Sequence, residues 1–267
     1  MLMVLLAGCG TFIEGPLPVA WGDIVVADVG DAQILDARSA EDYAAGHVPG
    51  AANVHWTELT GPDDDDLWDV RPPEELVAVF EARGISSDAP IVVYGSGPEG
   101  YGDDGNVFWM LRYLGHSDVR VLNGGWAGWL ASGGEIADGE DGPAPTAFDA
   151  AVDDSVFATT AQVEAWDGAL LDVRSEEEWL GGHIPGAVWM DWTDMFDDSG
   201  ALLEPEAARA RLEEVGIGGE QDVITYCAGG IRAGHTFMVL EALGIPAKNY
   251  VGSWARWSGE VGEVAYP

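Results

Sequence analysis

A long internal repeat constrains the fold of this chain more than any other feature. The segment LDARSAEDYAAGHVPGA at 35–51 aligns without a gap with LDVRSEEEWLGGHIPGA at 171–187. Three shorter pairs follow in the same order at slightly smaller offsets: IVVYG with VITYC, LRYLG with LEALG, and GWAGW with SWARW. Each copy is about the size of a small domain, so the chain of 267 residues is expected to fold as two copies of one unit.

Each copy alternates short apolar runs, many of them β-branched, with segments of helical spacing. The predicted elements recur in both copies: strands at 34–36, 91–94, 170–172 and 223–226, and helices at 107–114 and 233–243. Strands that alternate with helices indicate an α/β fold, in which a parallel sheet has helices on both faces. We expect a leader and tether at 1–19, a first domain at 20–135, a linker at 136–155 and a second domain at 156–267.

The charge balance excludes several classes of partner. The chain has 47 acidic and 11 basic residues, which gives a formal net charge of −36. A surface this acidic repels nucleic-acid phosphates and anionic lipid headgroups, so we expect no nucleic-acid partner and no polybasic attachment to a membrane. The apolar content of 47% is that of a globular protein, and the acidic surface suits salty surroundings that screen charge.

The first ten residues resemble a bacterial lipoprotein signal. An apolar run ends in Leu6-Ala7-Gly8-Cys9, the pattern that is cut before a cysteine, which then receives lipid. We therefore expect lipidation at Cys9 and a protein tethered at the cell envelope, with membrane contact through that anchor alone. The segment lacks the positively charged residues that normally precede the apolar run of such a signal. This leaves open a start further upstream, or an ordinary buried N-terminal strand in a cytoplasmic protein.

Two widely separated cysteines argue against a disulfide framework and against a cysteine-rich zinc site, so we expect no metal. Cys227 ends a buried strand and is followed by Ala228, Gly229, Gly230, Ile231 and Arg232. The glycines allow backbone N–H groups to turn inward, while a helix N-terminus and Arg232 add positive charge. These features favour a thiolate nucleophile at Cys227 held by the loop 228–231. This interpretation requires a thiol that solvent reaches and N–H groups that face it.

The repeated DxR and GH(I/V)PGA segment, combined with CxxGxR, resembles the rhodanese sulfurtransferases. The resemblance implies two rhodanese-like domains, each a mainly parallel five-stranded sheet with helices on both faces. It also implies that Cys227 takes sulfur from thiosulfate or 3-mercaptopyruvate and passes it, as a persulfide, to a thiol or cyanide. Residues 228–231 and Arg232 would hold the transferred sulfur. We expect no cofactor and a monomer. Gly95 stands at the position of Cys227 in the first copy, so the first domain is expected to be inactive.

Two departures from this family bear on the donor. The loop CAGGIR matches neither the CRKGVT of thiosulfate-preferring members nor the CGSGVT of mercaptopyruvate-preferring members. Glu178 also stands in the stretch where several tandem members place an arginine that helps to bind the donor. An acidic residue there predicts weak affinity for thiosulfate that improves with ionic strength.

Two other functions remain open. Cysteine phosphatases and arsenate reductases use a similar loop that ends in arginine, but with five residues between the cysteine and the arginine where this chain has four, residues 228–231. The stronger alternative is a non-catalytic envelope module that only binds or relays sulfur.

Several residues with reactive side chains are predicted to be structural. The Asp–Arg pair and the histidine of the long repeat occur in both copies, including the copy without a nucleophile, so we expect them to fix turns. These residues are Asp36, Arg38, His47, Asp172, Arg174 and His183. His235 lies one helical turn beyond Arg232 and is expected to be a packed or exposed histidine of the helix. The tryptophans of WAGW and WARW are expected to pack in the core or between the domains.

Overall fold

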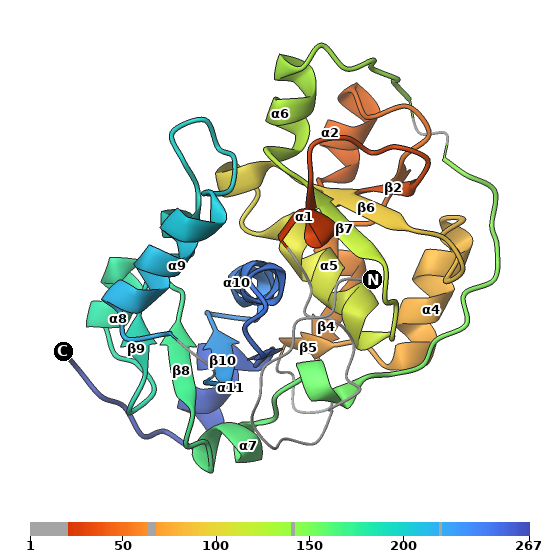
Figure 1. The fold of residues 1–267 in the computed structure, drawn as a ribbon. Helices are drawn as coiled ribbons and strands as arrows, with labels where there is room; N and C mark the ends of the chain where they lie inside the picture. The colour runs from red at the N-terminus through yellow and green to blue at the C-terminus, as the bar shows by residue number, and fades with distance from the viewer. Residues whose placement is uncertain (1–20, 63–67, 140–141, 219–220) are drawn as a thin grey trace, which may run out of the picture.

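The computed structural model describes residues 21–62, 68–139, 142–218 and 221–267, which form two α/β units (Figure 1). The first unit is built on a five-stranded sheet of order β1-β7-β6-β2-β3, in which every pairing is parallel. Its strands are β1 (Val25–Val26), β2 (Gln33–Asp36), β3 (Ala52–Asn53), β6 (Ile91–Tyr94) and β7 (Val119–Leu122). Every residue of β6 is buried, as expected for the central strand of a parallel sheet covered on both faces.

Helices and one hairpin complete the first unit. The helices are α1 (Trp21–Ile24), α2 (Ala40–Ala45), α3 (Trp56–Leu59), α4 (Pro73–Ala82), η1 (Gly97–Glu99), α5 (Asp103–Tyr113) and α6 (Gly125–Ala131). The strands β4 (Thr60–Pro62) and β5 (Trp68–Val70) pair antiparallel in a separate hairpin. Local sequence explains several helix ends. Ser39 caps α2, Pro73 is the first residue of α4, and Gly115 follows α5 with a left-handed φ of 85°.

The second unit repeats this plan with a sheet of order β11-β10-β8-β9, again parallel throughout. Its strands are β8 (Ala169–Asp172), β9 (Val188–Trp189), β10 (Val223–Tyr226) and β11 (Ala247–Asn249). Its helices are η2 (Asp154–Val156), α7 (Thr160–Glu164), α8 (Glu176–Leu180), η3 (Trp192–Met195), α9 (Pro205–Glu214), α10 (Ile231–Ala242) and α11 (Ser253–Glu260).

The prediction of five strands in the second sheet is wrong by one strand. In the first unit β1 pairs with β7 over two residues, whereas the matching segment of the second unit makes a single parallel bridge between Phe157 and Asn249. The chain then enters α7 at once. The Thr159 side chain accepts a hydrogen bond from the N–H of Gln162, and the Gln162 side chain accepts one from the N–H of Thr159. This capping box ends the extended segment before a second pair can form.

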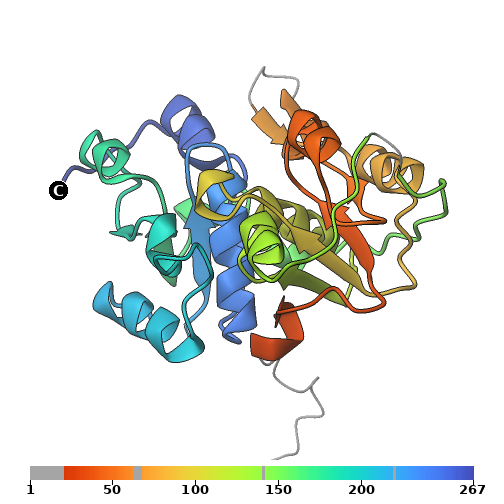
Figure 2. The ribbon, with the colours of Figure 1, turned by 90° about the horizontal axis from the view of Figure 1, so that it is seen from above.

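Helices α5 and α10 lie side by side and join the two units (Figures 1 and 2). Their buried side chains, such as Trp109 and Phe237, belong to one apolar cluster that includes residues of both units. Glycines permit the close approach. A Cβ at Gly105 would lie 2.2 Å from the Cα of His235, and a Cβ at Gly234 would lie 2.9 Å from a backbone atom of α5. The two sheets therefore share a core across this helix pair.

The predicted Asp–Arg pairs form in both units with nearly the same geometry. Arg38 Nη2 lies 2.5 Å from Asp36 Oδ2, and Arg174 Nη2 lies 2.6 Å from Asp172 Oδ2. Each arginine also donates to a carbonyl oxygen eight residues downstream, at the end of the following helix. These buried pairs link the carboxyl end of a strand to the next helix, which confirms the structural role that the repeat predicts.

The repeated histidines also stabilise turns. The His47 ring stacks on Tyr43 with ring centroids 3.8 Å apart, and the His183 ring stacks on Trp179 at 3.4 Å. Each imidazole Nδ1 also lies within hydrogen-bond distance of the carbonyl oxygen of its stacking partner, at 2.9 Å and 3.4 Å respectively. These contacts account for both histidines without a role in catalysis.

The segment predicted as a linker packs on the first unit. Ala137 forms an antiparallel bridge with His47, and Phe148 is buried. Ala265 forms the matching bridge with His183 in the second unit. Each GH(I/V)PG turn is thus held by the segment that follows the last helix of its own unit. No helix within the described ranges is both long and apolar enough to cross a bilayer.

Candidate active site

Cys227 is the first residue after β10 and lies before α10, as the sequence predicts. Its backbone N–H donates to Oγ of Ser253 at 3.1 Å, and its carbonyl oxygen accepts from the N–H of Trp254 at 3.0 Å. The N–H of Gly230 donates to Sγ of Cys227 at 3.1 Å. Gly230 has φ of 87°, and a Cβ there would lie 2.9 Å from the Cα of Val251, so this turn of the loop requires glycine.

The thiol is enclosed rather than open to solvent. Cys227 is 2% exposed and contributes to the apolar cluster, whereas Ala228 and Gly229 are partly exposed at the tip of the loop. The expectation of a solvent-accessible thiol is therefore wrong for this structure. The expectation of an N–H group that faces the sulfur is met by Gly230. A donor can reach the thiol only when the side chains that cover it move.

Arg232, in the first turn of α10, is buried and held by Glu178 of α8. Its Nη1 and Nη2 donate to Oε2 and Oε1 of Glu178 at 2.7 and 2.8 Å. Burial acts to lower the pKa of Arg232, but the bonds to Glu178 and the nearby charge of Cys227 outweigh it and raise that pKa. The guanidinium is therefore a permanent cation close to the thiol.

Glu178 is fixed in turn by the start of its own helix. The N–H and the Oγ of Ser175 each lie 3.0 Å from Oε2 of Glu178, in a capping box. Burial acts to raise the pKa of Glu178, but the hydrogen bonds from Arg232 and Ser175 outweigh it and lower that pKa to about 2. The carboxylate is therefore ionised at any ordinary pH. The sequence singled out Glu178 as an obstacle to the donor, but it did not predict the pairing with Arg232.

A tyrosine from the first unit covers Arg232. The Tyr101 ring centroid lies 4.7 Å from the guanidinium carbon, which is a cation–π contact. Tyr101 is 53% exposed and has φ of 61°, which is unusual for a residue other than glycine. A Cβ at the next residue, Gly102, would lie 3.2 Å from the Cα of Arg232. Sequence analysis missed Tyr101, because no pattern in the repeat indicates how one unit meets the other.

The matching loop of the first unit holds a carboxyl group where the second unit holds a thiol. A Cβ at Gly95 would lie 2.2 Å from Oδ1 of Asp103, so Asp103 occupies the space of a nucleophile at position 95. The N–H groups of Ser96 and Asp104 donate to this carboxyl at 3.4 and 2.9 Å. Burial and the neighbouring Asp104 raise the pKa of Asp103 well above its ordinary value. The place that a nucleophile would take in the first loop is therefore filled by a carboxyl group, in line with the expected inactivity of the first domain.

His235 packs between the units one turn beyond Arg232. It is 1% exposed, its Nδ1 lies 3.2 Å from Oδ1 of Asp104, and its ring stacks on Phe196 with centroids 4.9 Å apart. The sequence left open whether His235 is packed or exposed, and the structure shows it packed. Its link to Asp104 depends on the docking of α5 against α10. In the part of the chain that the structure describes, no three His, Cys, Asp or Glu side chains gather as a set of metal ligands.

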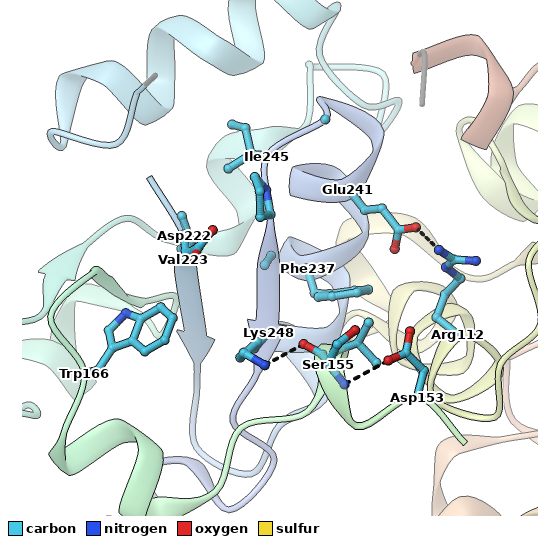
Figure 3. Close-up of a pocket in the computed structure, with 14 residues that line it drawn as sticks. Arg112, Asp153, Ser155, Trp166, Asp222, Val223, Phe237, Glu241, Ile245 and Lys248 are labelled. Atoms are coloured by element: carbon cyan, nitrogen blue, oxygen red, sulfur yellow. Dashed lines mark hydrogen bonds and ion pairs between the residues drawn. The ribbon is translucent and has the colours of Figure 1, made fainter. Parts of the chain in front are cut away.

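A separate cavity of about 570 Å³ lies at the opposite end of β10 (Figure 3). Asp222 and Val223 line it at the start of the strand, and Glu241 lines it near the end of α10, 2.6 Å from Nη2 of Arg112. Burial raises the pKa of Glu241 even beside this arginine. Cys227 does not line this cavity, which is therefore distinct from the candidate active site.

A family model and several named proteins match most of this chain. The family model of the rhodanese-like domain matches residues 25–132 and again residues 158–260. A thiosulfate sulfurtransferase of Azotobacter vinelandii is 35% identical over 240 residues, covering 84% of this chain and 87% of that protein. The sulfur carrier protein TtuD of Thermus thermophilus is 33% identical over 251 residues, covering 82% of this chain and 85% of that protein.

Solved structures with a similar fold point to the same family as the sequence matches. The crystal structure of SseA from Escherichia coli, a 3-mercaptopyruvate sulfotransferase, superposes with a TM-score of 0.74 at 25% identity, covering 83% of this chain and 92% of that one. Other structural neighbours are longer, and the chain spans 63–66% of their length. The two matched segments coincide with the two α/β units described above. The chain therefore belongs to the rhodanese-like family and is a sulfurtransferase with two rhodanese-like domains.

Proposed function

We propose that this protein moves sulfane sulfur from thiosulfate or 3-mercaptopyruvate to a thiophilic acceptor through a persulfide on Cys227. The observation that carries the proposal is the contact between the Gly230 N–H and Sγ of Cys227 at 3.1 Å, close to the cationic Arg232. A hydrogen-bond donor and a cation near one sulfur stabilise negative charge on it. The persulfide would lie in the loop formed by residues 228–231, with Arg232 at its end.

In the first half-reaction the Cys227 thiolate attacks the outer sulfur of the donor. With thiosulfate, the S–S bond breaks and its electron pair leaves with sulfite. With 3-mercaptopyruvate, the C–S bond breaks, the electron pair stays on carbon, and the proton of the donor thiol ends on that carbon to give pyruvate. In the second half-reaction the acceptor attacks the terminal sulfur. Cyanide leaves as thiocyanate, and the thiolate of Cys227 is restored.

Mass spectrometry of the protein after exposure to each donor tests this mechanism. The peptide that contains Cys227 should gain the mass of one sulfur atom and lose it on addition of cyanide, with release of thiocyanate. Cys227→Ser should gain no sulfur and form no thiocyanate. A wild-type protein that gains no sulfur from either donor, or a Cys227→Ser protein that still transfers it, would contradict the mechanism.

One observation favours a second function, that of a sulfur relay. One relative at 33% identity is named a sulfur carrier protein. A relay would load one sulfur and release it to a partner protein, without repeated turnover on a small acceptor. Many equivalents of thiocyanate per protein favour the enzyme, and one equivalent favours the relay. Phosphate ester hydrolysis has no such support, because four residues rather than five separate Cys227 from Arg232.

We also propose that the protein is anchored at the cell envelope through lipid on Cys9, which lies outside the described residues. The support is the sequence Leu6-Ala7-Gly8-Cys9. Metabolic labelling with radioactive palmitate tests it, and the chain offers a matched pair of variants because it has two cysteines. Cys9→Ser should lose the label and Cys227→Ser should keep it. An unlabelled wild-type protein would instead favour a cytoplasmic location.

A further inference from the structure

The cavity of about 570 Å³ at the amino-terminal end of β10 has the size of a small-molecule site, and the proposed sulfur transfer does not use it. It lies at the edge of the second sheet opposite Cys227, where β10 and β11 begin and α10 ends. Its wall includes Arg112 from α5 of the first unit, Ser155 from η2, and residues of the second unit (Figure 3). A molecule bound there would touch both domains.

Most of the wall is apolar, and it includes two aromatic side chains. Trp166 lies on one side of the cavity, and Phe237 of α10 lies nearer the other (Figure 3). Trp166 is partly exposed, whereas Phe237 belongs to the apolar cluster that the two units share. Val223 and Ile245 add aliphatic surface to the same wall. This lining favours a ligand with a flat apolar body.

The charged side chains of the wall leave one negative charge in excess. Arg112 and Glu241 form an ion pair at 2.6 Å, so their charges cancel. The other charged side chains that line the cavity are the cation Lys248 and the two carboxylates Asp153 and Asp222. The net charge of −36 on the whole chain acts in the same direction. An organic cation is therefore attracted to this cavity, and an organic anion is repelled.

The carboxylate of Glu241 still lacks a hydrogen-bond donor. Its Oε1 pairs with Arg112, but its Oε2 is buried and has no partner in the described part of the chain. The two cations of the wall already donate to backbone carbonyl oxygens, Arg112 to His116 at 2.9 Å and Lys248 to Ser155 at 2.7 Å. The Nε–H of Arg112 is also buried without a partner, although both terminal nitrogens of that guanidinium donate. An ammonium group would bring N–H donors of the kind that Oε2 lacks.

We propose that this cavity binds a small organic cation with a flat apolar body, of the class of arylalkyl amines. The ring of the ligand lies against Trp166 and Phe237, and its ammonium group lies toward Asp222 and Glu241. Attraction between the cation and the aromatic rings adds to the attraction of the carboxylates. Cys227 does not line the cavity, so this binding does not depend on the proposed sulfur transfer.

Isothermal titration calorimetry with two matched probes tests this proposal. Tryptamine and indole-3-propionate share an indole ring and a two-carbon arm, but they carry opposite charges. We expect tryptamine to show saturable binding with a Kd of about 0.1–1 mM, the range open to a ligand of this size. Indole-3-propionate should bind at least roughly tenfold more weakly, a difference set by its charge. Methylammonium has no ring and should not saturate, which controls for attraction to the acidic surface.

Variants of the wall locate the bound probe. Asp222→Asn should weaken tryptamine roughly two- to fivefold and Lys248→Met should strengthen it by a similar factor, the scale of one exposed charge pair. Asp88→Asn is the matched control, because Asp88 is exposed and precedes β6, the strand that the repeat matches with β10. It should leave the Kd unchanged. Trp166→Leu removes one aromatic face and should weaken the binding of tryptamine as well.

Cys227→Ser separates this site from the candidate active site, and it should bind tryptamine as the wild type does. Loss of binding in that variant would place the probe at Cys227 and overturn the proposal. Binding of indole-3-propionate as tight as that of tryptamine, or no saturable binding of tryptamine, would also overturn it. If Asp88→Asn weakens tryptamine as much as Asp222→Asn, the attraction belongs to the whole acidic surface and the cavity is not a cation site.

Discussion

Gly105→Ala is a quantitative test of the contact between the two domains. A Cβ at position 105 would lie 2.2 Å from the Cα of His235, whereas two carbon atoms in contact normally lie about 3.5–4.0 Å apart. The atom that it meets belongs to the backbone of α10, so no side-chain rotation relieves the overlap. Helices α5 and α10 would have to separate, and the apolar side chains between them would lose contact.

Two opposing effects set the size of the change. Alanine inside a helix is favoured over glycine by about 1 kcal/mol. An extra carbon in a well-packed core costs about 1–3 kcal/mol, and more where the backbone must move. The overlap at Gly105 involves backbone, so we place its cost at about 3–4 kcal/mol. After the gain of about 1 kcal/mol, the free energy of unfolding should fall by about 2–3 kcal/mol. For a chain of this size the Tm should fall by roughly 4–12 °C.

Thermal unfolding measures this change, and Gly259→Ala is the matched control. Gly259 also lies in a helix, α11, but a Cβ there would have nothing within 4 Å. Alanine at position 259 should leave the stability unchanged or raise it by up to about 1 kcal/mol. If the Tm of Gly105→Ala equals or exceeds that of Gly259→Ala, the two domains do not approach each other as described.

Three other changes test separate parts of the structure. Asp36→Asn breaks a buried ion pair of the first domain, so it should lower the free energy of unfolding by about 2–4 kcal/mol. It should leave the rate of sulfur transfer unchanged. Denaturant titration measures the first effect and a thiocyanate assay measures the second. Gly95→Cys in a Cys227→Ser background should not restore transfer, since the new side chain would meet the Asp103 carboxyl, and thiocyanate formed by that protein would disprove this. The contribution of Glu178 to stability should be present above about pH 4.5 and be lost as the pH falls toward 2, because folding lowers its pKa from 4.5 to about 2. The difference in stability between the wild type and Glu178→Gln should shrink over that range, and a constant difference would exclude an ionised Glu178 as its source.

Features that depend on one copy of the repeat could be predicted from the sequence. The pair between Asp172 and Arg174 joins residues two positions apart, and the place of Cys227 follows from a strand, a glycine loop and a helix in succession. These contacts are local, so their residue types and spacing are enough to indicate them. The fifth strand of the second sheet was predicted wrongly because it depends on a few backbone hydrogen bonds near Phe157, which compete with the start of α7.

Features that depend on the docking of the two copies could not be predicted. Tyr101 and Arg232 lie in different domains, and no periodicity or charge pattern indicates which loop of the first domain meets α10. The same holds for Asp104 and His235, which meet across the helix pair. The burial of Cys227 was also missed, since the contacts that hold its loop come from Ser253 and Trp254, which are distant in the sequence. An accessible thiol was therefore an incorrect expectation from the strand and the glycine loop alone.

The first-domain loop that lacks a nucleophile also carries Tyr101, whose ring lies against Arg232 of the second domain. The Asp103 carboxyl fills the space beside Gly95, so the first loop needs no bound anion to satisfy the N–H groups of Ser96 and Asp104. A loop that is satisfied internally can hold Tyr101 at a positive φ, a conformation that costs free energy and persists only where surrounding contacts enforce it. Those contacts are supplied by α10, against which the adjoining Gly102 packs.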